Sequence, residues 1–131
     1  MTAAEALEEL SEISSQISAA VLMRDDGAVE AATVAPSRAD ALARAARRLL
    51  ETAGEGRELT QLEAAVAGGS VFVVREGPRT LAATTGPQPT VGLVFYDLKS
   101  CLRTITAGEL EAQQADATPK RTRKKENGAP G

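Results

Sequence analysis

The apolar positions near the N-terminus recur at a helical spacing of three and four residues, with glutamates between them. These apolar positions are Leu7, Leu10, Ile13 and Ile17. Thr2 is a suitable N-cap, and Glu5, three residues later, completes a capping box. The pattern predicts a helix over residues 3–15.

Two short runs with strand character follow, on either side of a turn sequence. Residues 17–23 are almost entirely apolar, and Asp25-Asp26-Gly27 is typical of a hairpin turn. Residues 28–35 alternate poorly and have small side chains. We therefore predict a β-hairpin whose second strand lies at the edge of a sheet.

A second helical pattern begins where Pro36 stops this strand. Ser37 offers an N-cap with Asp40 three residues later, and Gly54 is the expected C-terminal glycine. The apolar side of the predicted helix, residues 37–53, consists of Leu42, Ala46, Leu49, Leu50 and Ala53. Because the helix is rich in alanine, another backbone can approach it closely.

Three strands are predicted next, and they are residues 59–67, 70–76 and 79–85. Gly68-Gly69 and Gly77-Pro78 provide the two turns between them. Residues 71–74 (VFVV) are apolar on both faces of the middle strand. This pattern favours a central strand with both faces covered.

The last ordered element is ambiguous in its local sequence. Residues 91–96 resemble a strand, but apolar residues keep a helical period over residues 91–105. We predict a helix that starts after Thr90 and frays within residues 109–114. The pattern ends near residue 106, so we predict one domain over residues 1–106 and a disordered basic tail over residues 107–131.

Composition limits the core and the compartment. Of the 131 residues, 43% are hydrophobic but only 2% are aromatic, so the core must be aliphatic and thin, and oligomerisation would bury more of it. Residues 1–106 hold 14 acidic and 10 basic side chains, which argues against a nucleic-acid-binding face. With one cysteine, no signal-peptide pattern and no apolar run of about 18 residues, we expect a cytoplasmic protein without a transmembrane segment.

The residues for common catalytic and metal chemistry are missing. The chain has no histidine, so Ser-His and Cys-His nucleophiles and a Cys/His zinc site are excluded. Cys101 is consistent with a buried small hydrophobe, and Asp25-Asp26 with turn chemistry rather than a metal pair. Gly68-Gly69-Ser70 lacks the lysine of a phosphate-binding loop. We expect no catalytic residue, no metal and no cofactor.

Two basic clusters remain open to more than one interpretation. Arg44, Arg47 and Arg48 lie close together on the second helix, where they form either a solvated face, with Arg47 paired to Glu51, or a partner-docking surface. The tail contains Lys120, Arg121, Arg123, Lys124 and Lys125. This tail cluster is either a solubilising end or a weak, salt-sensitive contact for nucleic acid, an anionic membrane or an acidic partner.

The element order α-β-β-α-β-β-β-α, with an Asp-Gly hairpin after the first strand and Gly-Leu near the start of the last helix, resembles the roadblock/dynein light chain family. The matching residues are 20–27 (AVLMRDDG) with Ala31-Ala32, 39–50, 71–74 (VFVV), 81–84 (LAAT) and 91–94 (VGLV). The resemblance covers residues 3–105 and depends on pattern and order, since no single motif is specific.

The resemblance implies an α+β fold with one five-stranded antiparallel sheet, helices 1 and 3 on one face and helix 2 on the other. It also implies a homodimer, or a heterodimer with a related chain. Third strands would pair edge to edge and second helices would pack together, which here means residues 59–66 and 39–53. The expected interface residues are Leu42, Ala46, Leu49, Ala53, Thr60, Leu62 and Ala64.

Family members bind Ras-like GTPases as activators or scaffolds, or act as motor and signalling adaptors. The resemblance therefore implies a non-catalytic, dimeric platform for a small GTPase. No residue can be assigned as an arginine finger, so any activation would position the GTPase's own groups. Two alternatives stay open: a small-ligand sensor or signalling adaptor domain, and an accessory that binds nucleic acid or membrane through its tail.

Overall fold

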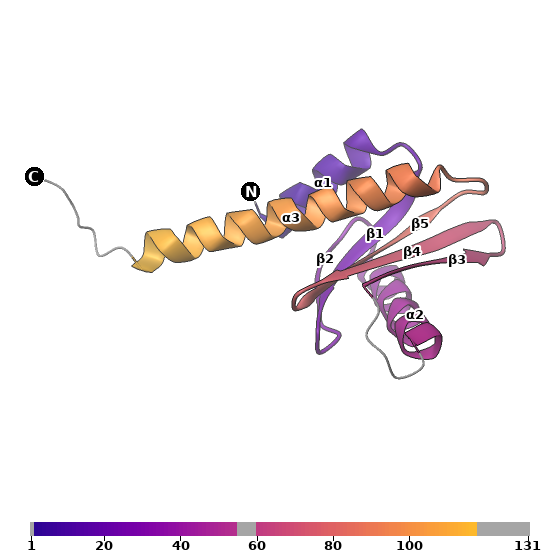
Figure 1. Ribbon diagram of the computed structural model, residues 1–131, viewed down its shortest axis with the longest axis horizontal. Coiled ribbons are helices and arrows are strands. Elements are labelled where there is room, and N and C mark those ends of the chain that lie inside the picture. The colour runs from indigo at the N-terminus through magenta and orange to yellow at the C-terminus, as the bar shows by residue number, and fades with distance from the viewer. Residues whose placement is uncertain (1, 55–59, 118–131) are drawn as a thin grey trace, which may run out of the picture.

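The computed structural model describes residues 2–54 and 60–117, with side chains described as far as residue 110. Its elements follow the order predicted from the sequence (Figure 1). They are α1 (Ala3–Ile13), β1 (Ile17–Arg24), β2 (Val29–Ala32), α2 (Pro36–Gly54), β3 (Gln61–Val66), β4 (Gly69–Glu76), β5 (Arg79–Thr85) and α3 (Val91–Ala117).

The strands form one antiparallel sheet in the order β2-β1-β5-β4-β3. This confirms the predicted α+β class, the five-stranded antiparallel sheet and the position of β2 at one edge. Strand β4 lies between β5 and β3 and is buried along most of its length. This agrees with the covered strand predicted from its apolar sequence. At the opposite edge from β2 lies β3.

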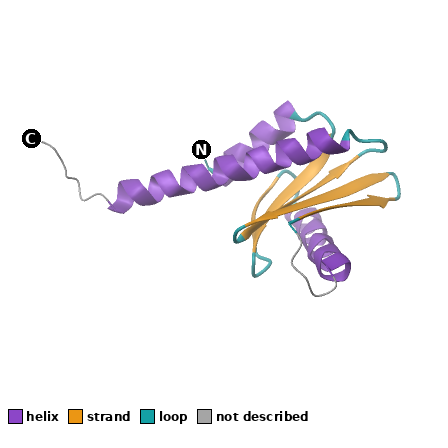
Figure 2. Ribbon diagram, in the orientation of Figure 1, coloured by secondary structure: helices purple, strands orange, loops and turns teal. Residues whose placement is uncertain are grey.

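Helices cover both faces of this sheet, with α1 and α3 side by side on one face and α2 on the other (Figure 2). Because successive side chains of a strand point to opposite faces of the sheet, the strands contribute side chains to two cores. On the α1/α3 side Phe72 is fully buried and meets Phe95 edge to face, with ring centroids 5.0 Å apart. On the α2 side, Ala39, Ala43 and Ala46 bring the helix close to the sheet.

The helix starts show where local sequence rules succeed and fail. At α1 the predicted capping box is present: the Thr2 hydroxyl accepts from the Glu5 amide at 3.1 Å, and the Thr2 amide donates to Glu5 Oε1 at 2.8 Å. At α2 the predicted Ser37 cap is wrong, because the helix already begins at Pro36. Proline suits the first helical position, where its missing N–H needs no partner.

The turn between β3 and β4 also differs from the prediction. Val66 pairs with Gly69, so the two-residue turn is Ala67-Gly68 rather than Gly68-Gly69. Gly68 takes the left-handed conformation that the turn requires, at φ +80°. Gly69 is instead the first residue of β4, where an added Cβ would lie 1.9 Å from the Thr85 carbonyl oxygen. The two glycines thus serve different purposes.

Helix α3 is longer than the sequence pattern predicts. It continues to Ala117, so the boundary predicted after residue 106 falls inside the helix. Figure 1 shows α3 running well past the end of the sheet. Within the described part of the chain, no helix combines the length and the apolar character needed to cross a membrane.

Candidate interaction surface

The edge strand β3 is the least covered part of the sheet. Helix α2 lies mainly over β1, β2 and β5. Along β3, Leu62 and Ala64 are half-buried, while Val66 on the same face keeps 49% of its surface exposed. Thr60, just before the strand, is exposed, and its carbonyl oxygen accepts a hydrogen bond from the Arg75 amide at 2.8 Å, which extends the ladder with β4.

The hydrogen-bond pattern identifies which backbone groups of β3 point outward. In an antiparallel pair, the N–H and C=O of a given residue point the same way, and this direction alternates along the strand. Since the Thr60 carbonyl points to β4, the backbone N–H and C=O groups of residues 62, 64 and 66 also point to β4. Gln61, Glu63 and Ala65 therefore direct their N–H and C=O groups away from the sheet. This outward row is a template for another strand.

The predicted interface residues of α2 do not share one environment. Leu42 and Leu49 are half-buried at the border of the α2-side core, together with Leu62 of β3. Ala53 is exposed. Ala46 is fully buried beneath the helix, at 0% exposure, because it faces the sheet. The available surface of this flank of α2 is thus formed by Leu42, Leu49 and Ala53.

The three arginines of α2 are exposed but diverge in direction. Arg47 packs against the β1–β2 hairpin, where a Cβ added to Gly27 would lie 2.3 Å from its Nη1. The predicted pair of Arg47 with Glu51 is not among the ion pairs of the described residues. Arg44 and Arg48, four residues apart, share the outer face of the helix. The arginines of the tail, and its lysines, lie outside the described residues.

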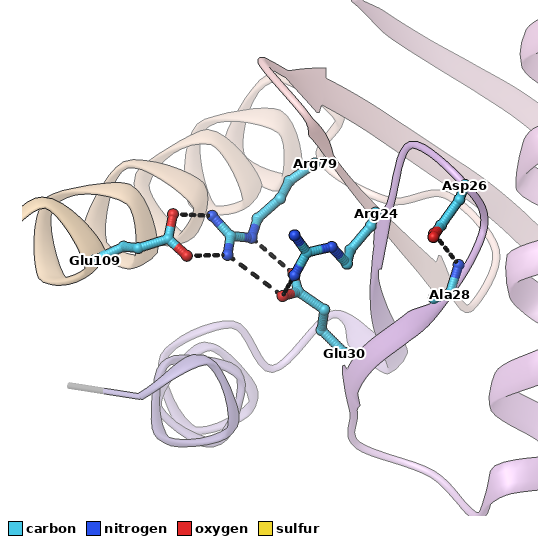
Figure 3. A network of polar contacts seen from close by, with 6 residues as sticks. All are labelled: Arg24, Asp26, Ala28, Glu30, Arg79 and Glu109. Carbon is cyan, nitrogen blue, oxygen red and sulfur yellow. Dashed lines mark hydrogen bonds and ion pairs between the residues drawn. The ribbon is translucent and has the colours of Figure 1, made fainter. Parts of the chain in front are cut away.

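A second polar feature was not foreseen from the sequence. Arg79 is buried to 8% exposure and joins two carboxylates from distant parts of the chain (Figure 3). Its Nε donates to Glu30 Oε1 at 2.7 Å, and its Nη1 donates to Glu109 Oε1 at 2.8 Å. Arg24 also donates to Glu30, at 3.1 Å. The network ties β2, β5 and α3 together.

These contacts shift the pKa of Arg79 and the pKa of Glu109. The hydrogen bonds that Arg79 donates to Glu109 and then to Glu30 raise the pKa of Arg79, and Arg79 in turn lowers the pKa of Glu109. Burial is the largest cause of another shift, which raises the pKa of the Cys101 thiol to about 11. That thiol contacts the Ala6 carbonyl oxygen at 3.6 Å, between α1 and α3. Cys101 is therefore a packed core residue with little thiolate character.

The sequence matches no protein-family model and no curated protein. Solved structures are nevertheless similar. A Roadblock/LC7 domain from Streptomyces avermitilis superposes with a TM-score of 0.73 at 19% identity, over 84% of this chain and 99% of that one. The chain has the Roadblock/LC7 fold. MglB of Myxococcus xanthus matches with a TM-score of 0.62 at 14% identity, covering 82% of this chain and 94% of that one. An MglB with a tetrameric arrangement gives 0.60 at 18%, covering 79% and 84%.

The resemblance suggested by the element order is thus confirmed for the fold. In this fold, Leu42 and Leu49 of α2 and Leu62 of β3 pack against the same core. Nearly the whole Streptomyces domain is matched by only part of this chain, so the chain contains residues without a counterpart in that domain.

Sequence reasoning missed Arg79, Glu30 and Glu109 because no local rule links positions so far apart. An arginine directly after a Gly-Pro turn is unremarkable in sequence, and Glu109 falls where the apolar pattern has ended. Within this Roadblock/LC7 fold the three side chains meet only because the β1–β2 hairpin, the start of β5 and α3 converge at one end of the sheet.

Proposed function

We propose that this chain is a non-catalytic, dimeric binding platform that scaffolds or regulates a small Ras-like GTPase. The observation that carries the proposal is the uncovered β3 edge, together with the half-buried apolar flank of α2 on the same face of the sheet. The Roadblock/LC7 fold supports a regulator or scaffold of a small GTPase system. Two parts of this proposal are tested separately: the surface through which two copies pair, and the binding of the GTPase.

Self-association is favoured by the chemistry of β3. The strand has no proline and no lysine, and its single charge is Glu63, so it lacks the features that usually protect an exposed edge. Two copies related by a twofold axis would pair β3 with β3 and bring the two α2 flanks together. Leu42, Leu49 and Ala53 would then become buried. One solved MglB, a similar structure, has a tetrameric arrangement.

The outer face of α2 would remain available on such a dimer. Arg44 and Arg48 lie there, exposed and without an ion pair in the described part of the chain. Arginine is enriched at protein interfaces, and its charge suits an acidic patch on a partner. In this proposal the platform contributes binding and orientation, and the GTPase contributes its own catalytic groups.

The dimer is tested by light scattering coupled to size exclusion at micromolar concentration. Ala65→Pro removes an outward N–H of β3 while leaving the hydrogen bonds to β4 intact, because Ala65 points away from β4. Ala65→Thr is the matched control, since it keeps the N–H and favours a strand. We expect dimers for the wild type and for Ala65→Thr, and dissociation at least tenfold easier for Ala65→Pro.

A monomeric wild type would overturn the dimer, and an unaffected Ala65→Pro dimer would exclude the β3 edge as its interface. The partner is tested separately, by co-purification with small GTPases of the same genome loaded with GDP or with a GTP analogue. We expect binding to one nucleotide state and its loss in Arg44→Glu/Arg48→Glu. Equal binding by this double variant would place the docking surface elsewhere.

A further inference from the structure

A cavity of about 310 Å³ opens between the C-terminal half of α2 and the end of the sheet that carries the β1–β2 hairpin. It is lined by Met23, Arg24, Asp25, Arg47, Leu50, Glu51, Arg75 and Thr80. These residues come from β1 and its turn, α2, β4 and β5, so the cavity is formed only when the sheet and the helix pack together. Its volume is at the lower end of the range for small-molecule pockets.

Three arginines from three different elements converge on this cavity. Arg24 already has a carboxylate partner in Glu30, at 3.1 Å. Neither Arg47 nor Arg75 has a carboxylate within 4 Å among the residues described. Asp25 and Glu51 line the same cavity, but neither forms an ion pair with Arg47 or Arg75 among the described residues. Two guanidinium groups that line one cavity without an ion pair are unusual, because like charges disfavour close approach.

Arg75 provides the second observation. Its Nε is buried, and within the described part of the chain this atom has no hydrogen-bond partner. A buried donor left without an acceptor costs about 1–3 kcal/mol, and more when it is charged. An acceptor supplied by a ligand would remove that cost. Arg75 is positioned by the backbone bond from its own amide to the Thr60 carbonyl.

Arg47 is held in place by the hairpin. Its guanidinium packs on Gly27, which sits at φ +89° and has no room for a side chain between its backbone and Nη1. Beside the arginines, Met23 and Leu50 provide an apolar wall, and the buried Thr80 contributes a hydroxyl. Asp25 and Glu51 reduce the positive charge of the lining, which favours a compact anion over an extended polyanion.

We propose that this cavity binds a small molecule with an oxyanion head, a phosphate or a carboxylate, held by Arg47 and Arg75. The planar guanidinium matches both head groups, and two such groups can bind one head from two sides. A small apolar body would rest on Met23 and Leu50. This site goes beyond the GTPase platform. Arg47 lies on the flank of α2 opposite Leu49, about 160° away at 3.6 residues per turn, so the site does not require the dimer.

The test uses the full chain, labelled with ¹⁵N, and titrates inorganic phosphate, pyrophosphate or succinate at constant ionic strength. We expect saturable shifts of the Gly27 and Ala28 amides, with the phosphate and succinate arms identifying the preferred head. Arg47→Gln should weaken binding at least tenfold. Arg44→Gln is the matched control, because Arg44 lies on the same helix but does not line the cavity, and its affinity should be unchanged.

Two further variants separate binding from folding. Glu51→Gln removes a carboxylate of the lining that competes with an anionic ligand for the arginines, so it should strengthen binding several-fold. Replacing a residue with a purely structural role would not strengthen binding. Arg75→Gln should weaken binding while the spectrum stays dispersed. The proposal is overturned if no probe gives saturable shifts, if Arg44→Gln weakens binding as much as Arg47→Gln, or if Arg75→Gln lowers Tm but keeps the wild-type affinity. If Arg75→Gln does not fold, the affinities of Arg47→Gln and Glu51→Gln still test the proposal.

Discussion

Replacing Arg79 by methionine would remove the cation that joins β2, β5 and α3 (Figure 3). Methionine retains most of the apolar stem, so the change isolates the guanidinium. Removing one partner of a buried ion pair costs about 3–5 kcal/mol. Here Glu109 is 45% exposed and regains water, and Glu30 keeps Arg24 at 3.1 Å. We therefore expect the free energy of unfolding to fall by about 2–3 kcal/mol.

Equilibrium unfolding in urea, followed by circular dichroism, measures this loss. The midpoint should fall at an unchanged m-value, because the surface exposed on unfolding is the same. Arg103→Met, at an exposed arginine of α3, is the matched control and should stay within about 0.5 kcal/mol of the wild type. A loss below about 0.5 kcal/mol for Arg79→Met would show that the network is a solvated surface pair.

Acid pH provides an independent check on the same contact. Arg79 lowers the pKa of Glu109 below its ordinary value of 4.5, so this contribution is fully present above 4.5 and is lost as the pH falls through the folded value. Glu109→Gln should lose less than about 1 kcal/mol at neutral pH, since Glu109 is exposed. The difference from the wild type should shrink on acidification. A difference that does not change with pH would refute the assignment.

Three further substitutions and one chemical modification test the packing of the fold. Gly69→Ala forces a Cβ against the Thr85 carbonyl oxygen and should destabilise the protein by about 2–3 kcal/mol in urea unfolding. Gly92 is exposed in α3, and an added Cβ would have nothing within 4 Å. Gly92→Ala should therefore be neutral or stabilising by up to about 1 kcal/mol in the same assay. The raised pKa of Cys101, about 11, predicts alkylation at pH 8 on the order of 100-fold slower in the native than in the unfolded chain. Phe72→Ala should lose about 3–5 kcal/mol in the same urea assay, because the ring is fully buried.

The sequence predicts much of this fold because its local signals agree with one another. The capping box at Thr2 and the Asp-Asp-Gly hairpin are read within a few residues, and the structure confirms both. The helical stripe of α1 is confirmed at the buried Leu7 and Leu10, but the helix ends at Ile13, which is 67% exposed, and Ile17 begins β1. The apolar run of β4 also correctly indicates a strand covered on both faces. Each of these features is determined by contacts close in sequence or by burial that a pattern records directly.

The errors arise where a choice depends on distant contacts. Either glycine of Gly68-Gly69 can occupy a tight turn, and only the approach of Thr85 decides that Gly69 belongs to the strand. The length of α3 was underestimated because its apolar period ends near residue 106, while Glu109 is fixed by Arg79 of another element. Ala46 was predicted at the dimer interface, but it is fully buried against the sheet. Helical periodicity identifies a stripe of apolar side chains but not which neighbouring element the stripe faces.

Helix α2 separates three surfaces that the proposals assign to three different contacts. Leu49 and its apolar neighbours border the core that Leu62 of β3 also borders, Arg47 lines the hairpin cavity, and Arg48 lies on the outer face. Because the helix is packed through Ala46 in the sheet-facing core, a ligand that draws Arg47 inward acts on the same rigid element that would carry the dimer and the partner. Such a ligand changes partner affinity only if it binds the free and partner-bound platforms differently. The reciprocal measurement, ligand affinity with and without the partner, must then change by the same factor.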